Sequence, residues 1–129
     1  MNTDQRRLEL DELTKKVIGC IYAVSNTLGS GFLEKVYENA LAIELRKAEL
    51  NVEQQHRIQV NYEGIAVGEF LADLVVEKSV ILELKAAKGF DENHYAQCLN
   101  YLKATGFTIC LLVNFGKPRA EIKRVVNQF

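Results

Sequence analysis

The segment 73–85 reads DLVVEKSVILELK, two apolar runs joined by the polar tripeptide 77–79. Aliphatic and β-branched residues on both sides of a short polar turn predict an antiparallel hairpin. With a three-residue loop, Val76 pairs with Val80, and this pair sets the register of the two strands. We expect the remaining elements to assemble around this hairpin.

That register places Asp73 directly across from Glu83, and Lys85 shares the face of Glu83 because side chains alternate along a strand. Like charges directly opposite on a sheet destabilise it by roughly 0.2–1 kcal/mol when exposed, and apolar neighbours increase the cost. Lys85 offsets part of the repulsion. A divalent cation would offset the rest, since Mg²⁺ favours one or two protein carboxylates. The tripeptide Glu83-Leu84-Lys85 alone is more typical of an ion pair on a hairpin surface, so that alternative stays open.

The residues before the hairpin predict two helices and one more strand. Apolar residues spaced by three or four predict amphipathic helices over 8–28 and 33–48. Gly29-Ser30-Gly31 ends the first helix, because glycine commonly follows a helix C-terminus. Alternating apolar and polar residues over 52–62 then predict a half-exposed strand, and a second strand follows over 66–76.

The residues after the hairpin's second strand, 80–86, predict a crossover. Asp91 is a good N-cap for a helix over 92–105, and the apolar run 107–113 predicts a strand buried on both faces. A strand, a helix and a buried strand form a right-handed crossover, so the last strand should lie parallel to 80–86. Residues 120–126 could add an edge strand. The fold class is therefore α/β, a mixed sheet covered by helices.

Length and composition limit the class of protein. A chain of 129 residues predicts one domain over 1–129, and 48% hydrophobic with 26% charged residues is typical of a globular protein. Dedicated nucleic-acid-binding domains are usually strongly basic, so at a formal net charge of −1 any such role must rest on a local patch or on partners. No apolar run reaches the ~20 residues that cross a bilayer, and no secretory signal is evident. We therefore expect a cytoplasmic protein without a membrane partner.

Two other features have ordinary explanations. Cys20, Cys98 and Cys110 lie in separate apolar stretches and are expected to be small buried residues, since three are too few for an all-cysteine iron–sulfur cluster. The segment 117–124 holds four cations against Glu121 alone. A solvated surface is favoured there over a nucleic-acid-binding patch.

Two helices supply further candidates for a site near the hairpin. Glu34 opens the second helix after Gly31, a glycine expected to let the helix approach the sheet and aim a third carboxylate at the patch. On the third helix, His94, Gln97 and Tyr101 are spaced by three and four residues and share one face. A polar face suits contact with a phosphate or a base, although each residue alone is more typical of a solvated surface.

Several motifs together carry a family resemblance. The segment 31–37, GFLEKVY, matches the pattern G-x-x-E-x-x-Y, and the chain resembles the GxxExxY family over residues 13–126. The other motifs that carry this resemblance are YENAL (37–41), DLVVE (73–77), ELKA (83–86), QCLNYL (97–102) and LVNFG (112–116). That family is similar in turn to the PD-(D/E)XK nuclease superfamily, especially its RecB-like branch. The resemblance implies a restriction-endonuclease-like core, α-β-β-β-α-β, with an extra N-terminal helix here.

The resemblance also implies roles for individual residues. Asp73 and Glu83 correspond to the metal-binding carboxylates, Glu34 to the helical glutamate that completes the metal shell, and Lys85 to the lysine of the E-x-K motif. Gln97 and Tyr101 match the Q-x-x-x-Y motif of the RecB-like branch. Ala72 stands where the superfamily pattern has proline, which leaves the carboxylate after it in place.

The function implied is phosphodiester hydrolysis that depends on Mg²⁺ or Mn²⁺. Asp73, Glu83 and Lys85 would be catalytic, and His94, Gln97 and Tyr101 would position a nucleic acid, with DNA favoured over RNA. The alternative is a non-catalytic nucleic-acid-binding or scaffold module of the same fold. A third interpretation is that the chain acts as a homodimer or as a subunit of a repair or defence complex.

Overall fold

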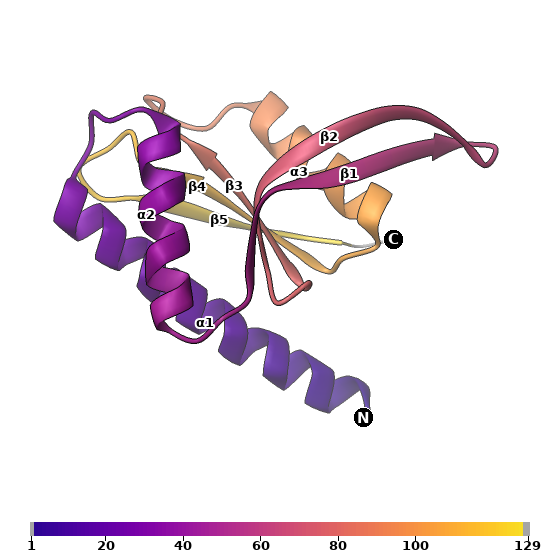
Figure 1. The fold of residues 1–129 in the computed structure, drawn as a ribbon, viewed down its shortest axis with the longest axis horizontal. Coiled ribbons are helices and arrows are strands. Elements are labelled where there is room, and N and C mark those ends of the chain that lie inside the picture. The colour runs from indigo at the N-terminus through magenta and orange to yellow at the C-terminus, as the bar shows by residue number, and fades with distance from the viewer. Residues whose placement is uncertain (1, 128–129) are drawn as a thin grey trace.

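In a computed structural model, which describes residues 2–127, a five-stranded sheet has helices on both faces (Figure 1). The strand order is β1-β2-β3-β4-β5. The order of helices and strands agrees with the sequence prediction, and the C-terminal edge strand is confirmed. The elements are α1 (Thr3–Leu28), α2 (Glu34–Lys47), β1 (Val52–Tyr62), β2 (Ile65–Val76), β3 (Val80–Lys85), α3 (Glu92–Thr105), β4 (Ile109–Asn114) and β5 (Glu121–Val126).

Two element boundaries differ from the prediction by two residues or more. Helix α1 begins five residues earlier, because the Asn2 side chain accepts from the Gln5 N–H (2.8 Å) and forms a capping box that apolar spacing does not reveal. Strand β4 begins two residues later, because the Thr105 hydroxyl accepts from the Phe107 N–H (3.1 Å) while the chain is still leaving α3. Among the described residues, no helix combines the length and the hydropathy needed to cross a membrane.

Strand pairing follows the predicted hairpin and crossover. β1, β2 and β3 form an antiparallel meander, and β3 pairs with β4 in parallel. Val76 pairs with Val80, and the β2–β3 ladder continues only to the pair Leu74–Leu82. The predicted register is therefore correct, and the ladder ends immediately before Asp73 and Glu83.

The core has two layers, one on each face of the sheet (Figure 1). Helices α1 and α2 cover one face, and α3 covers the other. All six residues of β4 are buried, as expected of a strand between two helical layers. Each fully buried aliphatic side chain contributes roughly 1.5–3 kcal/mol, so β3 and β4 provide the rigid platform of the fold.

The far half of the β1–β2 hairpin extends beyond the sheet as an arm (Figure 1). The predicted alternation of β1 holds over most of its length, with Ile58 buried, but Tyr62 at its end is 67% exposed. On β2, residues 65–71 are all exposed, although the Phe70 ring contacts Tyr101 of α3 at 5.6 Å between centroids. Alternation in β1 also fails at 54–56, where three consecutive residues are half-buried.

Candidate metal and substrate site

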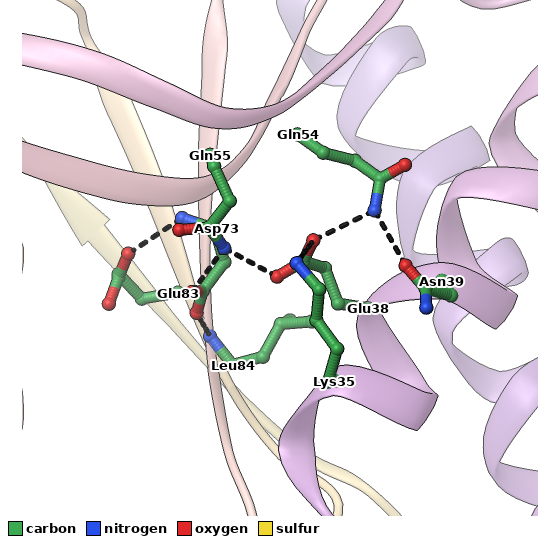
Figure 2. A network of polar contacts seen from close by, with 8 residues as sticks. All are labelled: Lys35, Glu38, Asn39, Gln54, Gln55, Asp73, Glu83 and Leu84. Carbon is green, nitrogen blue, oxygen red and sulfur yellow. Dashed lines mark hydrogen bonds and ion pairs between the residues drawn. The ribbon is translucent and has the colours of Figure 1, made fainter.

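Asp73 and Glu83 meet where β2 turns out of the sheet. Neither the β1–β2 ladder nor the β2–β3 ladder includes Asp73. Instead, the Asp73 N–H donates to Glu83 Oε1 (3.1 Å), and the Leu84 N–H donates to Asp73 Oδ2 (2.7 Å), as Figure 2 shows. Each carboxylate thus accepts a backbone N–H from the opposite strand, and the predicted juxtaposition of the two is present.

This pair is unfavourable as two anions. Glu83 is only 3% exposed, and burial, followed by repulsion from Asp73, raises its pKa to about 8. Burial also raises the pKa of Asp73, partly opposed by the hydrogen bond from the Leu84 N–H. A buried and a half-buried carboxylate that repel each other match the oxygen ligands of a hard divalent cation, which would stabilise both ionised forms.

Lys85 connects β3 to α3. Its Nζ donates to Gln97 Oε1 (3.2 Å), and Gln97 Nε2 donates to the Tyr101 hydroxyl (2.9 Å). No ion pair joins Lys85 to either Asp73 or Glu83, although its charge lowers the pKa of Glu83. The ammonium group is therefore beside the carboxylates and held from the helix side.

The polar face predicted for α3 is turned further inward than expected. Tyr101 is a core residue, 3% exposed, and burial followed by the charges of Glu83 and Asp73 raises the pKa of its hydroxyl. Tyr95, on the same helix, is 39% exposed. A tyrosine can lie inward here because Gln97 provides its hydroxyl with a hydrogen-bond partner.

His94 takes no part in this chain of hydrogen bonds. Its side chain instead caps the start of α3. Its Nδ1 accepts from the Asp91 N–H (3.3 Å) in a capping box, and its ring meets Phe90 edge-on at 6.5 Å between centroids. The structure confirms Asp91 as N-cap. The substrate-positioning role of His94 stays a prediction.

Glu34 lies at the start of α2 and is exposed. Its side chain forms no hydrogen bond or ion pair with the other residues of 2–127, yet its charge raises the pKa of both Asp73 and Glu83. In the same part of the chain, no three His, Cys, Asp or Glu side chains lie close enough to hold a metal ion by themselves. The structure thus brings Asp73 and Glu83 together and leaves Glu34 nearby but outside a closed cluster.

The loop before Glu34 is fixed by Tyr37. The Tyr37 hydroxyl donates to the Gly29 carbonyl (2.6 Å) and accepts from the Phe32 N–H (3.2 Å), and its ring stacks on Phe115 at 4.5 Å. The tyrosine of the G-x-x-E-x-x-Y pattern is therefore a buried anchor for the loop that leads into α2.

The role predicted for Gly31 is wrong. A Cβ added at Gly31 would meet no atom within 4 Å, so close approach to the sheet does not require glycine there; its φ of 112° does. Close approach occurs instead at Gly116, where a Cβ would lie 2.0 Å from the Ala87 carbonyl oxygen. Buried Asn114 accepts from the Ala87 N–H (3.0 Å) and donates to its carbonyl (2.9 Å), which fixes the chain just beyond Lys85.

Two hollows flank these elements. One of about 540 Å³ lies beside Glu34 and is lined by residues 31–35, Ala86 and Gly116. A larger one of about 800 Å³ lies between α1 and the turns at 77–79 and 106–108, by the opposite ends of β3 and β4 from Lys85. We associate the smaller hollow with the site because Glu34 lines it.

Glu38 is a site residue that the sequence did not reveal. It is 3% exposed; its Oε1 accepts from Gln55 (2.6 Å), and its Oε2 accepts from Gln54 (2.8 Å) and Lys35 (2.9 Å) (Figure 2). A signal was present, because Glu38 begins the stripe that continues with Leu41, Ala42 and Leu45 at the spacing of a buried helix face. A carboxylate in that stripe requires partners inside the protein.

The ordinary explanations for the cysteines and the basic segment agree with the structure. Cys98 and Cys110 are buried, Cys20 is half-buried, and all three thiols are free. Each cation of 117–124 faces a partner: Lys117 with Glu121, Arg119 over Tyr22, Lys123 over Tyr95 and Arg124 with Asp11.

Known proteins share this architecture. A family model described as the PD-(D/E)XK nuclease superfamily matches residues 11–125. The crystal structure of LHK-Exo, an alkaline exonuclease from Laribacter hongkongensis, is similar with a TM-score of 0.53 and 14% identity, over 73% of this chain and 56% of the exonuclease. The crystal structure of SSO0001 is similar with a TM-score of 0.59 and 20% identity, over 96% of this chain and 62% of that one. A search of curated proteins found no match.

At these identities the two solved structures show a shared fold, and the chain spans 56% and 62% of their lengths. The family model, by contrast, covers nearly the whole chain. The chain therefore belongs to the PD-(D/E)XK nuclease superfamily, and its mixed sheet is consistent with the restriction-endonuclease-like fold of that superfamily.

Proposed function

We propose that this chain hydrolyses nucleic-acid phosphodiester bonds with the help of Mg²⁺ or Mn²⁺. The observation that carries the proposal is the mutually repelling pair of half-buried Asp73 and buried Glu83, with Lys85 on the same strand as Glu83. Membership of a superfamily whose nucleases generally depend on divalent metal ions supports it. An alkaline exonuclease with the same fold supports the class of reaction.

The residues divide into a metal-binding group and a group that acts on the substrate. Asp73, Glu83 and the Leu84 carbonyl would hold the cation, with Glu34 completing the set from α2. A bound divalent cation polarises the phosphate and lowers the pKa of a coordinated water. Lys85 orients the attacking water and donates to a phosphate oxygen, which stabilises the charge that develops there.

Gln97 and Tyr101 support Lys85 in this mechanism. Gln97 Oε1 accepts from the Lys85 ammonium, and the Tyr101 hydroxyl accepts from Gln97, so this chain of two bonds restricts where Lys85 can point. We infer that the pair positions Lys85 and that Gln97 also contacts the substrate backbone. The Gln97–Tyr101 spacing supports assignment to the RecB-like branch, and Gly31, Glu34 and Tyr37 support assignment to the GxxExxY family. DNA is the favoured substrate.

A second candidate is a non-catalytic binding or scaffold module. The net charge of −1 and the partners of all four cations in 117–124 favour it, because this basic segment then offers no unpartnered cation to a phosphate backbone. The chain also spans little more than half of the solved structures that it resembles. A binding surface could then come from a partner subunit or a second copy.

A cleavage assay separates the two candidates. Purified protein is incubated with single- and double-stranded DNA and RNA in Mn²⁺, Mg²⁺ or EDTA, beside the variants Glu83→Ala, Lys85→Ala and Lys88→Ala. The nuclease proposal expects cleavage in the presence of metal that is abolished in the first two variants. Lys88→Ala, an exposed lysine three residues from Lys85, should cleave like the wild type.

Cleavage that survives in EDTA, or in Glu83→Ala, would contradict the proposal. Binding of nucleic acid without cleavage under any condition would favour the scaffold module.

A further inference from the structure

Gln55 has an unusual backbone conformation for a residue inside a strand. Its φ is 53°, in the left-handed region that only glycine, asparagine and aspartate adopt readily. The other non-glycine residues of 2–127 with positive φ lie in turns or directly after α2: Glu49, Glu63, Glu77 and Lys78. Strained backbone that persists inside a regular element commonly marks a functional position.

The conformation changes where the Gln55 side chain points. In a regular strand, Gln54 and Gln55 would face opposite sides of the sheet. Here both side chains reach Glu38 on α2, and Figure 2 shows them converging on it. Gln55 and its neighbour across the hairpin, Asp73, are both absent from the β1–β2 ladder, so the strand gives up regular pairing at this point.

One nitrogen of Gln55 serves two carboxylates. Gln55 Nε2 donates to Glu38 Oε1 at 2.6 Å and to Asp73 Oδ1 at 3.5 Å. The short bond to Glu38 sets where the amide lies, and the second N–H faces Asp73 at the limit of hydrogen bonding. Glu38 is itself fixed, since Gln54 and Lys35 donate to its other oxygen.

We propose that Gln55, held by Glu38, is a positioning residue that sets the orientation of the Asp73 carboxylate. Each oxygen of the Asp73 carboxylate then accepts from its own donor: Oδ2 accepts from the Leu84 N–H, and Oδ1 accepts from Gln55 Nε2. Glu34 lies one helical turn before Glu38 on the same face of α2, so this anchor also sets where Glu34 lies relative to Asp73. The inference deepens the proposed function and rests on Asp73 as a metal ligand.

Gln54 provides a matched control for Gln55. It is the adjacent residue, has the same side chain and donates to the same Glu38 carboxylate, but its other bond goes to Asn39 Oδ1 (2.8 Å) and not to Asp73. If Gln55 only fastened β1 to α2, replacing it should have the same effect as replacing Gln54. If Gln55 positions Asp73, the two replacements should differ in effect.

The experiment measures Mn²⁺ binding by calorimetry in the wild type, Gln55→Asn, Gln54→Asn and Asp73→Asn. Asparagine tolerates positive φ and keeps the amide, but its side chain is shorter and does not reach Asp73. We expect Gln55→Asn to weaken Mn²⁺ binding about 10- to 100-fold, the usual effect of losing a residue that orients a ligand. Gln54→Asn should change it by less than about threefold, and Asp73→Asn should abolish it.

A second readout needs no metal. Denaturation midpoints are compared for Gln55→Asn and Asp73→Asn, singly and together, and likewise for Gln54→Asn with Asp73→Asn. The effects should be non-additive for the Gln55 pair and additive for the Gln54 pair. Equal Mn²⁺ affinities of the two glutamine variants, with additive midpoints for both pairs, would overturn the positioning role.

Different results would refute the metal site at Asp73 and the positioning role of Gln55. If wild type and Asp73→Asn bind Mn²⁺ equally or not at all, the metal site at Asp73 is refuted, and non-additive midpoints would still show that Gln55 orients Asp73. If Mn²⁺ binding depends on Asp73 but not on Gln55, and the midpoints of the Gln55 pair are additive, the metal site stands and the positioning role is refuted.

Discussion

Asp73 and Glu83 occupy the positions where backbone pairing between β2 and β3 stops, and each accepts an N–H from the opposite strand. The same burial that gives them fixed directions also makes their ionised forms unfavourable. A site of this kind lowers the stability of the metal-free protein in order to bind a cation well, a trade-off common at functional sites.

Stability without metal should therefore fall as the pH rises from about 4.5 to about 8. Unfolded Glu83 ionises near 4.5, whereas the folded carboxyl keeps its proton until about 8, so in this range the folded state binds the extra proton. The stabilisation from this bound proton is fully present below pH 4.5 and is lost as the pH rises to about 8. The free energy of unfolding falls by up to roughly 1.4 kcal/mol for each pH unit in this range. Urea denaturation across this range measures the slope.

Glu83→Gln is the control for this slope, because glutamine does not titrate. The variant should show a much flatter dependence of the unfolding free energy on pH. An equal slope in wild type and Glu83→Gln would mean that another group is responsible.

Among the elements, the segment that follows β3 holds Lys85 in place through backbone contacts. Gly116 is the tightest point, since a Cβ there would lie 2.0 Å from the Ala87 carbonyl oxygen and 2.5 Å from its nitrogen. Both are backbone atoms, which cannot move aside as a flexible side chain can. Asn114 adds two hydrogen bonds to the same residue.

Gly116→Ala should thus lower the free energy of unfolding by about 1–3 kcal/mol, the usual cost of overpacking. Gly19→Ala is the contrasting variant, because it lies on an exposed position of α1 with nothing within 4 Å of an added Cβ. It should raise stability by about 0.5–1 kcal/mol, the preference for alanine in a helix. Chemical denaturation of both variants would test this, and equal effects would contradict the close approach.

The β1–β2 arm should be the least protected strand pair of the sheet. Beyond Ile58 and Phe70 its residues are mostly exposed, with Ile65 at 68%, whereas β4 is buried throughout. Amide hydrogen exchange should therefore be fast over residues 59–69 and slow in β3 and β4. Arm amides protected as strongly as those of β4 would show instead that a second copy or another molecule covers the arm.

The element order and the hairpin register could be predicted because they depend on periodicity and on a short loop of fixed length. Asp73 opposite Glu83 followed from that loop alone. The left-handed backbone of Gln55 could not be predicted, since glutamine has no preference for it and tertiary contacts with Glu38 impose it. Tyr101 lies deeper in the core than expected, because spacing reveals which residues share a helix face, but not how a hydroxyl is satisfied inside the core.

At the scale of the whole molecule, the net charge gives the least support to a nuclease function. A net charge of −1 gives no general attraction for a polyanion, and the cations of 117–124 already face partners. Lys85 is the cation that the proposed mechanism brings to a phosphate backbone. The chain also spans 56% and 62% of the solved structures that share its fold.

DNA binding by this chain should consequently depend only weakly on salt. Proteins that contact six to ten phosphates lose roughly 10³–10⁵ in affinity between 50 and 200 mM salt. Here we expect a loss of about tenfold or less, which corresponds to no more than about two phosphate contacts. Fluorescence anisotropy with labelled DNA in EDTA measures it, and a steep decline would reveal a basic surface that this account does not include.

The central claim is that Asp73 and Glu83 together hold a divalent cation. Anomalous diffraction from crystals soaked in Mn²⁺ tests it most directly. The expected result is a single strong anomalous peak between the two carboxylates, with Glu34 turned toward it, and no peak there in Asp73→Ala crystals. A wild-type structure in which Asp73 and Glu83 keep their present hydrogen bonds, with no anomalous peak between them, would contradict the claim.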